Sequence, residues 1–133
     1  MATYRPDGGS PRLDVFTAER TWDSYDLLGF LLALPWSAVP RVVVLDNASL
    51  HTSGVIRGAR AGLAAAGIYL YFLPPYAPEL NRIEPVFRQV KYQEMPQRSY
   101  TSRAELRTAV ETGFMTFNQH LKSKSKKEPR RAA

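Results

Sequence analysis

The sequence of 133 residues contains no cysteine. Disulfide bonds and zinc sites built on thiolates are therefore excluded. Long hydrophobic runs are also missing, because the longest, residues 27–36, is far short of the roughly 20 apolar residues that span a bilayer. The polar start has none of the apolar character of a secretory signal. We therefore expect a protein of a reducing cytoplasm, without a membrane partner.

Positive charge is concentrated at one end of the chain. The formal net charge is +6, and residues 122–133 hold six basic side chains against the single acid Glu128, which accounts for +5 of that total. A basic tail fits contact with the phosphate backbone of nucleic acid, although a solvated terminus has the same composition. We expect a folded domain over residues 1–121 and a basic disordered tail over residues 122–133.

Turn formers and apolar spacing together predict an alternation of strands and helices. Strands are expected near residues 2–6, 12–17, 41–46 and 68–73, and helices near residues 25–34 and 54–66, after Asn81, and from Ser102 to Leu121. The first two strands flank a turn-forming segment and suggest a hairpin. Residues 41–46 form a continuous apolar run, which is typical of a parallel strand covered on both faces. The following helix and strand complete a right-handed parallel crossover.

Two carboxylates stand where predicted elements meet loops. Asp46 ends the strand at residues 41–46, and Glu84 lies in the first turn of the helix after the proline-rich loop at residues 74–78. Ligands of open α/β sheets bind beyond the carboxyl ends of strands, so both side chains are expected at one edge, where they could hold Mg²⁺ or Mn²⁺. Each also has a structural reading: Asp46 could form an Asx-turn, and Glu84 could complete a helix cap with Asn81.

Several neighbouring side chains could contact a nucleic acid. His51 could touch a phosphate or support the metal site, or it could be a surface residue beside a helix cap. Arg82 and Lys91 lie on the helix of Glu84 and could meet the DNA backbone, or they could belong to a solvated helix face. Tyrosines at 69, 71 and 76 could stack on bases, but the first two are strand residues, so we expect them in the core.

The two acidic segments resemble motifs of one enzyme family. Residues 44–51, VLDNASLH, resemble the segment that carries the second catalytic aspartate of DDE-type transposases of the mariner-like superfamily, bacterial insertion-sequence branch. Residues 73–84, LPPYAPELNRIE, resemble the segment that carries their final catalytic glutamate, although the family usually has proline where this chain has Arg82. The resemblance makes Asp46 and Glu84 catalytic metal ligands. Asn47 and His51 belong to the same motif as Asp46.

The resemblance also implies a fold and an activity. The fold would be RNase H-like α/β of the retroviral-integrase type, a mixed sheet with flanking helices. The activity would be Mg²⁺- or Mn²⁺-dependent cleavage of DNA at transposon ends and joining of the freed 3′-hydroxyl to a target. Such a protein would act beside DNA, in the bacterial cytoplasm at the nucleoid.

One part of the family pattern is missing from the sequence. The family's first aspartate lies on a first central strand, upstream of a strand pair like residues 2–17, and Asp14 is a poor substitute because its place in the order suits the third strand. We therefore expect the C-terminal part of a catalytic domain, which is inactive alone unless a partner chain supplies the missing strand. The expected partners are a second copy of the chain, in a homodimer, or a complementing N-terminal transposase chain. Two alternatives stay open. One is a non-catalytic DNA-binding or transposase-interacting remnant, and the other is a different RNase H-like nuclease, which residues 74–81 argue against.

Overall fold

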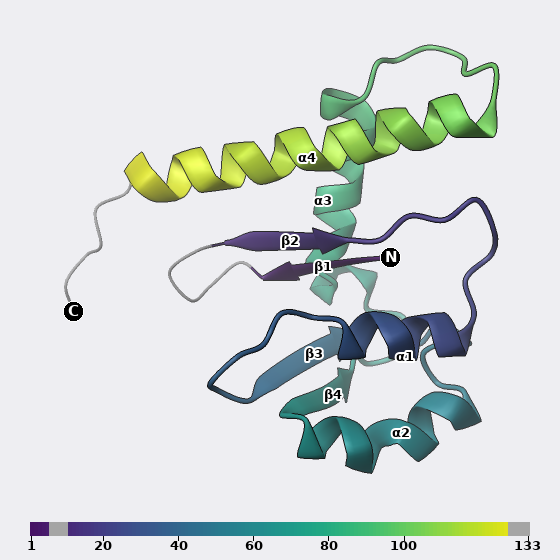
Figure 1. Ribbon diagram of the computed structural model, residues 1–133, viewed down its shortest axis with the longest axis vertical. Helices are drawn as coiled ribbons and strands as arrows, with labels where there is room; N and C mark the ends of the chain where they lie inside the picture. The colour runs from purple at the N-terminus through teal and green to yellow at the C-terminus, as the bar shows by residue number, and fades with distance from the viewer. Residues whose placement is uncertain (6–10, 128–133) are drawn as a thin grey trace. The chain divides into compact units, whose positions relative to one another are not determined.

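The computed structural model of the chain describes residues 1–5 and 11–127, with side chains described as far as Lys124 (Figure 1). The turn expected between the first two strands and the last six residues of the expected tail lie outside this part. The chain divides into two compact units, one formed by residues 1–19 and 82–133 and the other by residues 20–81. No helix among the described residues is long and apolar enough to cross a membrane.

The first unit begins with the predicted hairpin. Strand β1 (Ala2–Arg5) pairs antiparallel with β2 (Arg12–Val15). Helix α3 (Ile83–Gln89) passes into a single π-helical turn, η2 (Val90–Glu94), and α4 (Arg103–Lys127) packs against η2 and β2. The buried core of this unit is formed by side chains from β2, α3, η2 and α4, namely Leu13, Val86, Val90 and Phe117.

The Asn118 side chain of α4 forms hydrogen bonds with strand β2 of the hairpin. The Leu13 backbone N–H donates to the Asn118 side-chain carbonyl at 3.1 Å, and the Asn118 amide donates back to the Leu13 carbonyl at 2.7 Å. Asn118 thus bonds to β2 as a neighbouring strand would. Near the same place, the Tyr4 and Phe117 rings meet edge to face with their centroids 6.3 Å apart. Helix and hairpin are therefore joined by polar and apolar contacts together.

Helix α4 differs from its prediction at both ends. The Ser102 hydroxyl accepts the Glu105 backbone N–H at 3.1 Å, as expected of a capping box, but the Glu105 carboxylate turns to the N–H and hydroxyl of Thr101, both at 2.8 Å. At the other end α4 continues through Lys127. Residues 122–127 are therefore helical, where the sequence predicted the start of a disordered tail.

The second unit contains the predicted strand–helix–strand sequence. Strand β3 (Arg41–Leu45) pairs in parallel with β4 (Ile68–Phe72), and α2 (Gly54–Ala65) connects them, so the parallel crossover is confirmed. Gly67 ends α2 with a φ of 77°, a conformation that glycine adopts without strain. Helix α1 (Ser24–Leu32) packs on α2. The core joins apolar side chains of all four elements: Leu27, Phe30, Leu31, Leu45, Ile56, Leu63, Ile68 and Leu70.

Within the described part of the second unit, one face of the parallel sheet carries exposed side chains. Val42, Val44, Tyr69 and Tyr71 alternate with the buried positions of β3 and β4, and their side chains are exposed by about half or more. The predictions that β3 is covered on both faces and that these tyrosines are core residues are therefore wrong for this chain. In the described residues the strands form two separate two-stranded sheets. The α/β class is confirmed, while the single mixed sheet of an RNase H-like fold stays a prediction.

Two exposed ion pairs make stability depend on acid pH. The Arg20 guanidinium, followed by the Asp23 backbone N–H, lowers the pKa of Asp26 to about 2. The Thr101 backbone N–H and hydroxyl, followed by Arg98, lower the pKa of Glu105 to about 2. A carboxyl whose pKa is lowered by folding stabilises the folded state above its unfolded pKa of about 4, and this contribution disappears as the pH falls toward 2.

We expect these two ion pairs to contribute to the loss of stability against unfolding at acid pH. In the parent, the urea midpoint should fall between pH 4 and pH 2. In an Asp26→Asn, Glu105→Gln double variant, the urea midpoint should fall less between pH 4 and pH 2. Urea unfolding followed by circular dichroism at each pH measures the midpoints of parent and variant. Because both carboxylates lie at the surface, the difference should be modest and should shrink at high salt. Parallel curves for parent and variant would contradict the assignment.

Candidate functional site

The candidate site begins at the residue that follows β3. The Asp46 side chain is 44% exposed, and its Oδ1 accepts the Ala48 backbone N–H at 3.1 Å. This contact is the Asx-turn that the sequence offered as a structural reading of Asp46. A carboxylate has about four lone-pair sites, so the turn leaves acceptor capacity for a cation. The structural and functional roles of Asp46 are therefore compatible.

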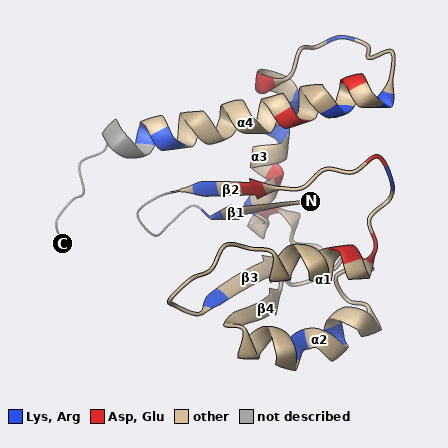
Figure 2. Cartoon of the chain, viewed as in Figure 1, with Lys and Arg blue, Asp and Glu red and all other residues tan. Residues whose placement is uncertain are grey.

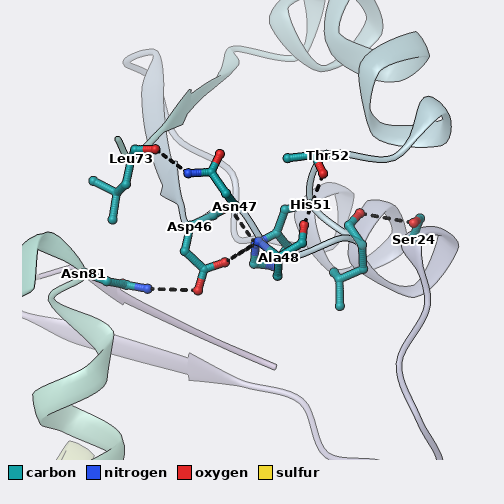
Figure 3. A network of polar contacts seen from close by, with 9 residues as sticks. Ser24, Asp46, Asn47, Ala48, His51, Thr52, Leu73 and Asn81 are labelled. Atoms are coloured by element: carbon teal, nitrogen blue, oxygen red, sulfur yellow. Dashed lines mark hydrogen bonds and ion pairs between the residues drawn. The ribbon is translucent and has the colours of Figure 1, made fainter. Parts of the chain in front are cut away.

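His51 faces the same carboxylate (Figure 3). Its Nδ1 lies 2.7 Å from Asp46 Oδ1 and 3.1 Å from the Asp46 backbone carbonyl oxygen. The carbonyl oxygen and the ionised carboxylate can only accept hydrogen bonds, so the proton between them belongs to Nδ1. The His51 backbone N–H also donates to the Ala48 carbonyl at 2.9 Å, which fixes the turn that carries the ring. The ring is therefore a donor to Asp46 rather than a side chain that faces only solvent.

Two asparagines connect the ends of β3 and β4. The Asn47 amide donates to the Leu73 carbonyl at 2.6 Å, and the Leu73 N–H donates to the Leu45 carbonyl at 2.8 Å. The Asn81 amide lies 3.5 Å from Asp46 Oδ2, as Figure 3 shows. The proline-rich loop after β4 thus turns back to the loop after β3. Both oxygens of the Asp46 carboxylate consequently have a donor beside them.

Asn81 makes a contact that its sequence position did not suggest. The sequence offered a helix cap with Glu84 as one reading of this segment, and the residue before α3 is Arg82. The Asn81 amide is directed to Asp46, which is 35 positions earlier in the chain. The spacing of Asn81 and Glu84 is that of a capping box, and nothing in the sequence marked the contact with Asp46.

Glu84 lies in the first turn of α3 and is exposed. It belongs to the first unit, whereas Asp46 belongs to the second. The meeting of these two carboxylates at one sheet edge therefore stays a prediction. Lys91 is exposed on η2, with its ammonium 5.0 Å from the centroid of the Tyr92 ring. Contacts of Arg82 and Lys91 with DNA also stay predictions.

The donor set around Asp46 fits one ligand of a hard cation. Mg²⁺ takes oxygen ligands, keeps several waters and is usually held by one or two carboxylates together with substrate phosphate. Asp46 offers such an oxygen at a partly exposed position. Across residues 1–5 and 11–127, however, no group of three or more histidine, aspartate or glutamate side chains could hold a metal ion. Asp14 is bound by Arg12 Nε at 2.6 Å on its own strand.

The strand–helix–strand unit, with Asp46 at the end of its first strand, places this chain among the α/β proteins, a class in which ligands commonly bind beyond the carboxyl ends of strands. The chain matches the family described as DDE superfamily endonuclease over residues 12–107, and it belongs to that family. The match covers both acidic segments, and members of the family typically use divalent metal and act on DNA. A search of curated proteins finds no match. A search of solved structures finds none either.

Proposed function

We propose that this chain is part of the catalytic domain of a mariner-like transposase of the bacterial insertion-sequence branch. Its reaction is metal-dependent cleavage of DNA at transposon ends, followed by transfer of the freed strand. The observation that carries the proposal is the oriented Asp46 carboxylate at the end of β3, inside a chain of the DDE endonuclease family. The branch assignment is supported by the two quoted motifs at residues 44–51 and 73–84.

Each residue of the candidate site has a distinct part in this proposal. Asp46 and Glu84 hold Mg²⁺ or Mn²⁺, which when bound activates the attacking oxygen and stabilises the leaving one. Asn47 keeps the end of β3 beside the end of β4 through the Leu73 carbonyl. Arg82 and Lys91 meet the phosphate backbone of the DNA.

We further propose that the complete site needs a carboxylate from outside the described residues. Two metal ions about 4 Å apart normally need a third bridging acid, and Asp46 and Glu84 supply two ligands. A second copy of the chain or a complementing transposase chain would supply the missing group. Alone, the chain would bind metal and DNA weakly and cut no strand.

A second candidate function is DNA binding without catalysis. Lys122 and Lys124 are exposed near the carboxyl end of α4, where Figure 2 shows basic residues on the last described turns. The sequence beyond them adds four more basic side chains: Lys126, Lys127, Arg130 and Arg131. A run of basic side chains of this kind contacts phosphates irrespective of base sequence. A remnant that keeps only this property would bind DNA in the same way with or without a divalent metal.

DNA affinity measured with and without Mn²⁺ distinguishes the two functions. At constant ionic strength, Mn²⁺ should strengthen binding of the parent to duplex DNA several-fold, because a cation held by carboxylates also takes phosphate oxygens. An Asp46→Ala variant should lose that increment and keep its salt dependence. Fluorescence anisotropy titrations over a range of salt concentrations measure both effects. Equal Mn²⁺ effects in parent and variant would contradict the catalytic proposal.

Truncation after Leu121 should reduce the salt dependence of DNA binding in the same assay and leave the effect of Mn²⁺ unchanged. The shortened chain loses six basic side chains. Since each neutralised phosphate contributes about 0.9 to the slope of log affinity against log salt, the slope should become shallower by up to about 5. The Mn²⁺ increment should remain. An unchanged slope of log affinity against log salt would show that residues 122–133 make no contacts with the phosphate backbone of the DNA.

A further inference from the structure

Asp46 is held by more donors than a strand end requires. The Asx-turn from the Ala48 N–H already closes the chain after β3 at 3.1 Å. His51 Nδ1 adds a second donor to the same oxygen, Oδ1, at 2.7 Å. Among residues 1–5 and 11–127, the donor to Oδ2 is the Asn81 amide at 3.5 Å, which is at the limit of a hydrogen bond. The two carboxylate oxygens are therefore unequal: Oδ1 is engaged and Oδ2 retains most of its acceptor capacity.

The loop that carries His51 is anchored on both sides. The Ser24 hydroxyl of α1 donates to the Leu50 carbonyl at 3.1 Å, just before His51. After it, the Ser53 hydroxyl accepts the Ile56 N–H at 3.4 Å and caps α2, in which Ile56 is fully buried. The imidazole is itself only 20% exposed. The ring position is therefore set by α1 and α2, before any cation is present.

We propose that His51 is a positioning residue that, through its Nδ1 proton, directs Oδ2 of Asp46 toward the metal. The proposal rests on the function given above and assigns a role that goes beyond it. By occupying Oδ1, the ring fixes the side-chain rotation of Asp46 and leaves Oδ2 as the ligand oxygen. A carboxylate that is already oriented loses less rotational freedom when it binds a cation. Hydrogen-bond partners of this kind typically contribute 10–100-fold to metal affinity.

The two nitrogens of the ring make the proposal testable by paired substitutions. An asparagine amide occupies roughly the place of Nδ1, whereas a glutamine amide occupies roughly that of Nε2. Mn²⁺ affinity, measured by calorimetry, should fall about tenfold in His51→Ala and in His51→Gln. In His51→Asn it should stay within about threefold of the parent. Thermal unfolding of the same variants should not follow this order, because a merely structural role would change stability and affinity together.

Each other outcome has a definite meaning. If His51→Gln restores affinity and His51→Asn does not, Nε2 is the active nitrogen and the proposal is wrong. If all three variants bind Mn²⁺ like the parent while Asp46→Ala does not, His51 has no positioning role and the proposed function stands. If Asp46→Ala also binds like the parent, the proposed function itself fails. Affinity that falls in step with thermal stability would assign His51 to the loop structure alone.

Discussion

Mn²⁺ binding should fall below detection when Asp46 is replaced by alanine, and Glu84→Ala should weaken it by at least about tenfold, or about 1.4 kcal/mol. The reason is the small number of ligands. A hard cation held by one or two carboxylates and water has no other protein oxygen to replace the one removed. Asp46→Ala is the more severe change because it removes the oriented carboxylate and leaves the Nδ1 donor of His51 without its side-chain acceptor.

Calorimetric titration of the free chain with Mn²⁺ measures this prediction without DNA or activity. A suitable control is Glu79→Ala, since Glu79 is an exposed acid of the short helix η1 (Pro78–Leu80), close to Glu84 in sequence. Its affinity should match that of the parent. If Asp46→Ala abolishes binding but Glu84→Ala does not alter it, Glu84 is not a ligand and the pairing of the two acidic segments is wrong.

We expect Asn118→Leu to lower the free energy of unfolding by about 2–4 kcal/mol. Leu13 is 2% exposed, and Asn118 bonds both its N–H and its carbonyl. Leucine offers neither a donor nor an acceptor, so two backbone groups would be left unpaired at about 1–3 kcal/mol each. Urea unfolding followed by circular dichroism measures the difference.

Gln119→Leu is the matched control for this change. Gln119 is the next residue of α4 and is exposed, so the same type of substitution should alter stability by less than about 0.5 kcal/mol. Asn118→Asp separates the two bonds further: it keeps an acceptor for the Leu13 N–H but turns a carboxylate oxygen to the Leu13 carbonyl. If Asn118→Leu lowers the free energy of unfolding no more than Gln119→Leu does, water replaces the hydrogen bonds of Asn118 to the backbone of β2.

Local patterns were sufficient to predict the elements of the second unit. The apolar run before Asp46, the helical spacing after Ser53 and Gly67 at the helix end together located β3, α2 and β4, and the parallel pairing followed. The DDE endonuclease family followed from the two acidic segments and is confirmed, whereas the mariner-like, insertion-sequence branch stays a proposal. These features succeed because each depends on residues close together in the chain.

The rest of the site depends on partners far apart in the sequence. Asn81 has the spacing of a helix cap, so local reasoning could not separate that role from a contact with a carboxylate 35 positions away. The donor role of His51 was likewise open until the ring and Asp46 were placed together. The apolar run of β3 predicts burial on both faces, but burial of the Val42 and Val44 face depends on what surrounds the strand and not on the strand alone.

The length of α4 changes how its basic end would meet a polyanion. Lys122 and Lys124 lie on the same continuous helix as Asn118 and Phe117, which contact the hairpin one turn earlier. Their backbone attachment points are spaced by the helical rise, about 3 Å along the axis, and cannot wander as those of a coil do. Charges held in this way would approach a DNA double helix in a fixed arrangement. Less conformational entropy would then be lost on contact, and the hairpin would set the direction of approach.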